Sequence, residues 1–195
     1  GKIAALGGIM IAVGLWGGGV VRLMMVGPVA PDTALSDLPA DVPIVQIVQP
    51  NIPQREKWRP ELQNQHFTQL LEMSRRPEGL RPDQKRIVIW PETAATFFVE
   101  TQTTARMQMA EILGPYDILI TGAPRTYPRD TDEYKVWNAI QVIDAGGHIV
   151  ASFDKFHLVP FGEYVPFRSI LPFPKLTAGR TDFSAGPGPQ TLSVN

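Results

Sequence analysis

The stretch "KRIVIWPETA" at residues 85–94 joins a strand signal to a charged residue. The apolar run Ile87 to Trp90 is typical of a short strand that is buried on both faces. Pro91 ends this run, and Glu92 follows it directly. Because ligands of α/β sheets gather at the carboxyl ends of strands, we expect Glu92 to lie at a functional edge of a sheet.

Strand and helix signals alternate on both sides of this stretch. Apolar runs predict strands, and apolar residues at helical spacing predict helices. In chain order the predicted elements are strand 44–50, helix 59–76, strand 86–90, helix 103–114, strand 117–123 and a hairpin of strands 136–144 and 148–153. Strands that first alternate with helices and then form a hairpin predict an α/β layered fold with a mixed sheet.

Composition narrows the range of functions. The net charge of −1 over 195 residues favours neither nucleic acid nor another polyanion as a partner. The chain contains no cysteine, so these residues hold no disulfide, thiolate metal site or cysteine nucleophile. The three histidines lack the spacing of metal ligands, and His157 in particular is expected to be structural. We therefore expect no metal site. Glycine motifs that bind the phosphate groups of cofactors are also missing, so we expect no cofactor either.

The first residues resemble a membrane span. Ile3–Val21 carries no charge, and as a helix of about 1.5 Å per residue it spans roughly 28 Å, close to the apolar thickness of a bilayer. Small residues recur at four-residue spacing, which favours close packing between membrane helices. We predict a transmembrane helix over 1–26, with a signal peptide or a buried soluble helix as alternatives. Residues 27–43 contain four prolines and are interpreted as a linker, and 44–195 as a soluble domain.

Three charged residues are candidates for chemistry. Glu92 is either a general base or an acid that is favoured by a helix N-terminus. Aromatic residues nearby in the sequence, Trp90 among them, are expected to shield it. Lys155 follows the strand at 148–153 and either stabilises an oxyanion or forms a solvated pair with Asp154. Glu163, in the rigid stretch "PFGEYVPF", is either exposed or functional.

Together these stretches resemble one family. The order of "VQPNIPQREKW" (48–58), "IVIWPETA" (87–94), "YDILITGAPR" (116–125) and the stretch 137–167 is similar to that in apolipoprotein N-acyltransferases. These are bacterial inner-membrane enzymes with a nitrilase-like domain that faces the periplasm. The segment "DKFHLVPFGEYVPF" is the most specific part, whereas "WPET" alone indicates only the wider carbon–nitrogen hydrolase superfamily.

The resemblance implies a fold and a site. The fold is a nitrilase-like four-layer α-β-β-α sandwich, here incomplete, that is preceded by one transmembrane helix. The site is a Glu–Lys–Cys triad, in which Glu92 stands at the position of the general base and Lys155 at that of the lysine. Glu163 matches a further required glutamate. Two more residues match positions near the family's active site and are expected to bind substrate: Trp58 and Asn138. The cysteine is expected downstream of Asn195, so we interpret the chain as a fragment that is inactive by itself.

The implied reaction is acyl transfer by a ping-pong route. A thiolate takes an acyl chain from a phospholipid, and the N-terminal amine of a diacylglyceryl-cysteine apolipoprotein then accepts that chain. The aromatic, proline-rich loop 156–174 is expected to face the lipid bilayer. Two alternatives remain open. One is a soluble amidase or nitrilase-like hydrolase, and the other is a membrane-anchored pseudoenzyme.

Overall fold

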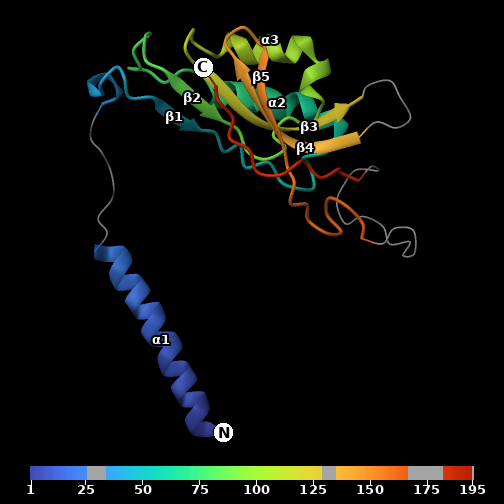
Figure 1. The fold of residues 1–195 in the computed structure, drawn as a ribbon. Helices are drawn as coiled ribbons and strands as arrows, with labels where there is room; N and C mark the ends of the chain where they lie inside the picture. Colours follow the sequence, from blue (N-terminus) through green and yellow to red (C-terminus); the bar gives the residue numbers. More distant parts are fainter. Residues whose placement is uncertain (26–33, 129–134, 167–181, 195) are drawn as a thin grey trace. The chain divides into compact units, whose positions relative to one another are not determined.

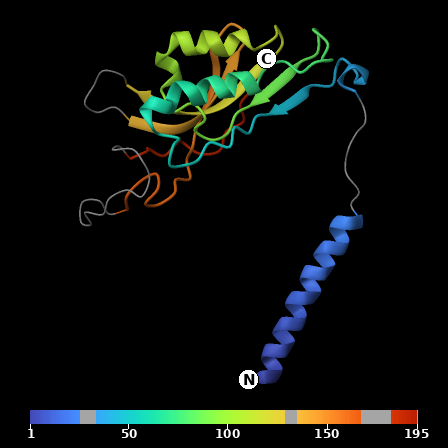
Figure 2. The same cartoon turned by 180° about the vertical axis from the view of Figure 1, so that it is seen from behind.

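The computed structural model describes residues 1–25, 34–128, 135–166 and 182–194 (Figures 1 and 2). These residues divide into two compact units, Gly1–Asp37 and Leu38–Asn195. The predicted linker 27–43 overlaps both units, and its residues 27–33 lie outside the described ranges. Its described part contains one short 3-10 helix, η1 (Leu35–Asp37).

The first unit contains one long helix, α1 (Lys2–Met25). Its segment Ala5–Met25 has a mean hydropathy of 1.6 and no burial within the protein. Arg22 lies in the last turn, where a positive charge is favourable next to the free carbonyl groups. The predicted helix is confirmed, and its length and composition suffice to cross a membrane.

The second unit is built on one mixed sheet with the strand order β1-β2-β3-β4-β5. The first three strands are parallel, and β4 and β5 continue the sheet in antiparallel pairing. Their bounds are Ile44–Ile47, Arg86–Ile89, Ile118–Tyr127, Lys135–Asp144 and Ile149–Asp154. Each predicted strand is present, and the prediction of an α/β fold with a mixed sheet is confirmed.

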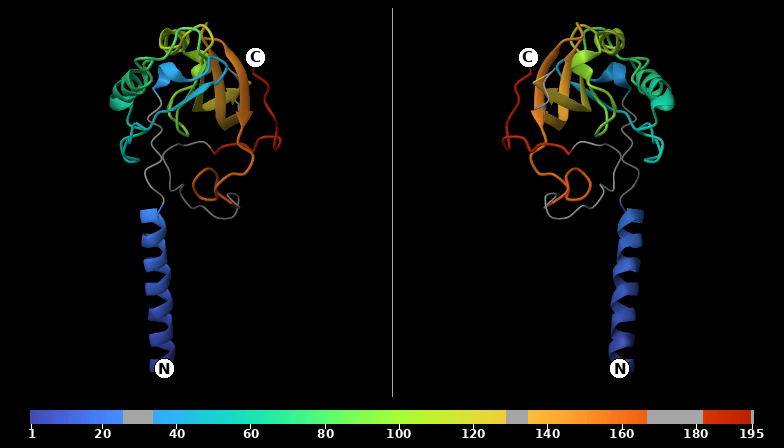
Figure 3. Two further views of the ribbon diagram at one scale, coloured as in Figure 1. Left: turned by 90° about the vertical axis from the view of Figure 1, so that its left-hand side faces the viewer. Right: turned by 90° about the vertical axis from the view of Figure 1, so that its right-hand side faces the viewer.

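Helices make the crossovers that the parallel strands require. The helix α2 (Pro60–Met73) connects β1 to β2, and η2 (Val99–Thr101) and α3 (Thr103–Glu111) connect β2 to β3. Both α2 and α3 lie against the same face of the sheet (Figures 1 and 3). The core forms between this face and the helices, from side chains that include Leu70, Val88, Val99, Met109, Leu119 and Ile143.

The opposite face of the sheet, the open face, is only partly covered within the described residues, since Val142 on it is buried while other side chains are exposed. Side chains alternate along each strand, so the neighbours of buried Val88 point away from the helices. On this face Ile47 is 76% exposed and Ile140 is 44% exposed. The expectation that β2 is buried on both faces is met only in part, because Ile87 and Ile89 on this side are half-buried and no helix covers them. The described residues supply one helix layer and one sheet layer of the expected sandwich.

A buried ion pair joins the starts of β2 and β3. Arg86 is fully buried, and its guanidinium lies 3.0 Å from the carboxylate of Asp117. Arg86 also donates to the carbonyl oxygens of Ser74 and Ile112, which follow α2 and α3. Burial lowers the pKa of Arg86 below its usual value, although the charge of Asp117 opposes this shift. This network satisfies a buried cation and ties both helices to the amino end of the sheet.

Candidate functional site

Glu92 lies at the carboxyl end of β2, as its sequence position predicts. After the strand, the amide of Trp90 donates to the carbonyl of Ile120, and Pro91 stops further pairing. The chain then turns back, with the amide of Ala94 donating to the carbonyl of Pro91 at 3.2 Å. Thr93 in this turn has φ of 50°, in the left-handed region that non-glycine residues rarely adopt.

Gly122 of β3 allows this turn to lie directly on the sheet. A Cβ at Gly122 would stand 2.4 Å from the amide nitrogen of Thr93 and 2.8 Å from the Cα of Glu92. Such distances are far below van der Waals contact, so only glycine fits without movement of the turn. The position of Glu92 therefore depends on a neighbouring strand that comes thirty residues later in the chain.

Strand geometry brings Asn138 and Lys155 to the same edge. In the register of β4 and β5, Ile140 is opposite Phe153, and the amide of Lys155 donates to the carbonyl of Asn138 at 2.8 Å. Side chains two residues apart share a face, so Asn138 and Lys155 lie on the open face together with Ile140 and Phe153. The turn that carries Glu92 lies over Gly122 on this face as well.

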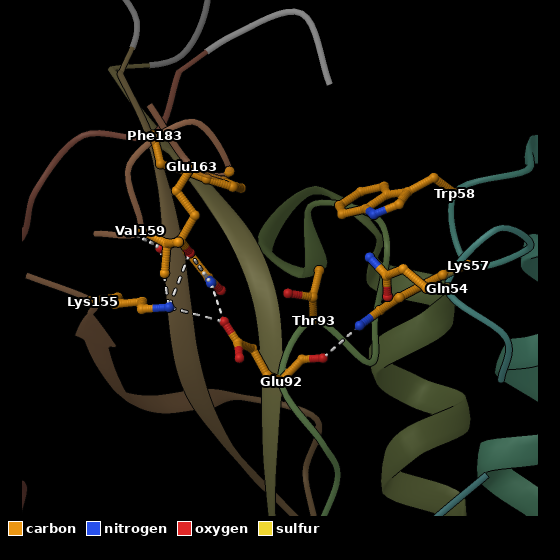
Figure 4. Close-up of a pocket in the computed structure, with 11 residues that line it drawn as sticks. Gln54, Lys57, Trp58, Glu92, Thr93, Lys155, Val159, Glu163 and Phe183 are labelled. Atoms are coloured by element: carbon orange, nitrogen blue, oxygen red, sulfur yellow. Dashed lines mark hydrogen bonds and ion pairs between the residues drawn. The ribbon is translucent and has the colours of Figure 1, made fainter. Parts of the chain in front are cut away.

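Four of the predicted site residues meet in one hydrogen-bonded cluster (Figure 4). The amide nitrogen Nδ2 of Asn138 donates to Glu92 at 2.6 Å and to Glu163 at 2.7 Å. The ammonium of Lys155 lies 3.2 Å from the Glu92 carboxylate and 3.1 Å from that of Glu163. Glu92 and Glu163 thus bind the same two donors, the side-chain amide of Asn138 and the ammonium of Lys155.

Glu163 is the buried member of the cluster, with a side chain that is 11% exposed. A tight turn holds it, because its amide donates to the carbonyl of Val159 while its carboxylate accepts from the amide of Val159. Burial acts to raise the pKa of Glu163, but the hydrogen bonds from Asn138, Val159 and Lys155 outweigh it and lower the pKa. Glu163 is therefore a carboxylate at neutral pH, and the alternative that it is exposed is wrong.

Lys155 is held as a cation. Burial acts to lower its pKa, but hydrogen bonds and charge from Glu163 and Glu92 raise the pKa above the ordinary lysine value. The alternative pairing of Lys155 with Asp154 is wrong, because Asp154 binds Arg125 across the other face of the sheet. A lysine in this state cannot accept a proton near neutral pH, so its chemistry is electrostatic.

The expected aromatic shielding of Glu92 is wrong within the described residues. Trp90 lies in the core, where it donates to the hydroxyl of Ser74 and meets Phe67 edge to face. Phe97 packs against the same Phe67. The side chain of Glu92 is 65% exposed, because it lies on the face that the helices do not cover.

A pocket of about 290 Å³ surrounds the cluster. Trp58 lines it, as expected for a residue near the site, from the turn that precedes α2. Several other residues that line the pocket were not predicted from the sequence, among them Gln54, Lys57, Thr93 and Val159. Lys57 stands beside Trp58 in the same motif, so that motif was the available signal. An adjoining apolar hollow of about 310 Å³ continues along the open face over Ile120, Ile140 and Phe153.

No metal site accompanies these groups in the described ranges. Among residues 1–25, 34–128, 135–166 and 182–194, no cluster of three or more histidine, cysteine, aspartate or glutamate side chains could hold an ion.

A glutamate and a lysine at the strand ends of an α/β sheet, joined by a second glutamate from the loop after β5, form a group of acid and base side chains at the edge where α/β enzymes bind ligands. The sequence profile of carbon–nitrogen hydrolases matches residues 44–182. The chain belongs to the carbon–nitrogen hydrolase family.

The relatives within this family are similar in sequence. The chain is 37% identical to an apolipoprotein N-acyltransferase of Bradyrhizobium diazoefficiens over 73% of its length and 28% of that protein. It is 42% identical to the enzyme of the same name from Rhizobium rhizogenes, over 66% of the chain and 25% of the relative. The chain thus spans about a quarter of the length of these relatives.

Solved structures are more distant. A crystal structure of an N-terminal amidase aligns with a TM-score of 0.40 and 16% identity, over 59% of this chain and 28% of the amidase.

Proposed function

We propose that this chain is part of an apolipoprotein N-acyltransferase. Such an enzyme moves an acyl chain from a phospholipid to the N-terminal amine of a diacylglyceryl-cysteine apolipoprotein. The observation that carries the proposal is the direct contact of Lys155 with both Glu92 and Glu163 at the strand ends. The sequence identity to two enzymes with this name supports the choice of reaction within the family.

In the proposed first half-reaction, Glu92 takes the proton of a cysteine thiol, and the thiolate attacks the ester carbonyl of the phospholipid. The carbonyl oxygen becomes an oxyanion beside Lys155. When the carbon–oxygen bond breaks, Glu92 returns its proton to the leaving alkoxide, and an acyl thioester remains. In the second half-reaction the apolipoprotein amine attacks this thioester, Glu92 accepts the amine proton, and the thiol leaves with that proton.

The cluster supports the acid–base and electrostatic parts of this route. An ammonium has three donors, and two of those on Lys155 serve Glu92 and Glu163. The third is left for the oxyanion. Glu92 is the more exposed carboxylate, which suits the group that exchanges protons with thiol, alkoxide and amine. We assign Glu163 and Asn138 to holding Glu92 and Lys155 in place, and Trp58 to the substrate side of the pocket.

The nucleophile belongs to a part of the protein outside these residues, since the chain has no cysteine. The open apolar face of the sheet supports a four-layer sandwich, because a second sheet would bury Ile47 and Ile140 there. Residues 44–195 are then the first part of this domain. A cysteine at a strand end of the second sheet would meet Glu92 on the face where Glu92 is exposed.

Membrane attachment is part of the proposal. The helix α1 would anchor the protein as a span over 1–26, and 27–43 would link it to the domain on the periplasmic side of the bacterial inner membrane. The described part of the loop 156–174 exposes Phe156, Val159 and Phe161, which fits contact with the bilayer. Residues 167–174 of this loop lie outside the described ranges.

The test uses the full-length protein, purified in detergent, with a fluorescent phospholipid and a diacylated lipopeptide. We expect the wild type to transfer the acyl chain to the amine. Glu92→Gln removes the base and should slow transfer by about 10²- to 10⁴-fold. Lys155→Met removes the oxyanion partner and should slow transfer by about 10²- to 10³-fold.

Lys135→Met is the matched control, because Lys135 is an exposed lysine at the start of β4, away from the pocket. It should leave the rate unchanged. Full transfer by Glu92→Gln would contradict the proposed base. Hydrolysis of a small amide to its acid and amine, without acyl transfer to the lipopeptide, would favour the hydrolase alternative instead.

A further inference from the structure

Lys57 contacts the turn that carries Glu92. Its ammonium donates to the main-chain carbonyl oxygen of Glu92 at 2.9 Å. Figure 4 shows Lys57 and Lys155 approaching Glu92 from opposite sides, one to the carbonyl and one to the carboxylate. We propose that Lys57 is a positioning residue that holds the turn Pro91–Ala94 so that the Glu92 carboxylate faces the site. This inference rests on the proposed function, because it takes Glu92 as the base.

The turn needs such a contact. Thr93 adopts a left-handed conformation without being a glycine, and such a conformation persists only where its surroundings hold it. Gly122 supports the turn from below but makes no hydrogen bond to Glu92 itself. The Glu92 side chain is mostly exposed, so packing does not hold it either. A charged donor on the carbonyl restrains the peptide plane between Glu92 and Thr93.

Lys57 is itself held well enough to act in this way. Its amide and that of Glu56 donate to the carbonyl of Pro53, which closes the short turn that carries it. Its side chain is half-buried between the site pocket and a second pocket of about 210 Å³. Burial lowers the pKa of Lys57, and the charge of Glu92 opposes this shift.

Titratable groups line both of the pockets that border Lys57. On the site side it faces Glu92, Lys155 and Glu163, and on the other side the second pocket contains His66 of α2. A cation at this position could instead contact the phosphate of the acyl donor directly. The two roles differ in kinetics, because a positioning residue affects the chemical step and a substrate contact affects binding.

The experiment compares Lys57→Met, Lys57→Arg and the control Lys135→Met in the full-length protein. The rate constant of thioester formation at saturating phospholipid and the KM for phospholipid are measured separately. We expect Lys57→Met to lower the rate constant by about tenfold to a hundredfold with KM unchanged, as for a base displaced by about 1 Å. Lys57→Arg should recover most of the rate, since a guanidinium also donates to a carbonyl.

Three kinetic results would overturn the inference. The first is an unchanged rate constant in Lys57→Met. The second is a raised KM with an unchanged rate constant, which would make Lys57 a contact for the donor phosphate. The third is a Lys57→Arg variant that is folded but as slow as Lys57→Met, because a positioning donor should be replaceable. If Lys57→Met does not fold, the rate constant and the KM of Lys57→Arg are compared with those of the wild type, and the same results overturn the inference.

A further readout separates this inference from the proposed function. It is hydrogen exchange at the amides of Ala94 and Ala95, which donate to the carbonyls of Pro91 and Gly122. If the wild type transfers no acyl chain, the proposed function fails. Faster exchange in Lys57→Met but not in Lys135→Met then still supports the role of Lys57, whereas unchanged exchange overturns it.

Discussion

At the scale of single residues, the site is a pair of carboxylates that share one amide and one ammonium. Two negative charges close together normally disfavour each other, and one pKa of such a pair rises. Here Lys155 and Asn138 lie between Glu92 and Glu163 and offset that repulsion. The result is one exposed carboxylate, that of Glu92, and one buried carboxylate, that of Glu163, which its hydrogen bonds keep charged.

The role of Glu163 can be tested through the charge of Lys155. In Glu163→Gln one negative partner is lost, so we expect the pKa of Lys155 to fall. The alkaline limb of the pH–rate profile of thioester formation should therefore move to lower pH, and the neutral rate should drop about tenfold to a hundredfold. An unmoved alkaline limb would show that Glu163 does not hold Lys155.

The same substitution has a pH-dependent effect on stability. The pKa of Glu163 is lower in the folded protein than the ordinary value of 4.5, so its contribution to stability is present above that value and disappears as pH falls through the folded pKa. Urea unfolding at pH 7 should show Glu163→Gln to be less stable than the wild type. At pH 3 the difference should be smaller. A constant difference at both values would contradict this assignment.

At the scale of elements, β3 determines where the end of β2 can lie. Gly122→Ala places a methyl group against the backbone of Glu92 and Thr93, with no flexible side chain that can yield. We expect a loss of about 1–3 kcal/mol in the free energy of unfolding. Thioester formation should slow, because the turn must move off the strand.

Gly17→Ala in α1 is the matched control, since a Cβ there meets no other atom within 4 Å. Urea unfolding and single-turnover kinetics measure both effects. A folded Gly122→Ala protein with wild-type rate and stability would mean that the turn does not depend on this close approach.

At the scale of the whole molecule, the sheet face away from α2 and α3 exposes apolar side chains such as Ile140 in the described part of the second unit. If a second sheet packs there in the full-length protein, Ile140→Ala creates a cavity and should cost about 2–5 kcal/mol in the free energy of unfolding. Met73, on α2, has a similar exposed fraction of 41% but lies on the helix side. Met73→Ala should cost less than about 1 kcal/mol. Equal costs for both variants would argue against a second sheet over Ile140.

The sequence by itself determined the elements of this fold. Apolar runs and helical spacing are local signals, and each predicted strand and helix of the second unit is present, with ends shifted by a few residues. Pro91 prevents β2, which ends at Ile89, from continuing to Glu92, because proline has no amide hydrogen for a sheet partner. Local signals left the roles of Glu92, Lys155 and Glu163 open, and only the resemblance to one family named them and Asn138 as site candidates.

Only the tertiary structure decided how these groups meet. The two hydrogen bonds of Asn138 depend on the register of β3 with β4, and the fit of Glu92 over Gly122 depends on the register of β2 with β3. The contact of Lys57 with the Glu92 carbonyl joins residues thirty-five positions apart. The spacing of residues along the chain does not predict such contacts, because they arise from backbone pairing between distant segments. For the same physical reason, the exposure of Glu92 followed from which face the helices cover and not from its aromatic neighbours in the sequence.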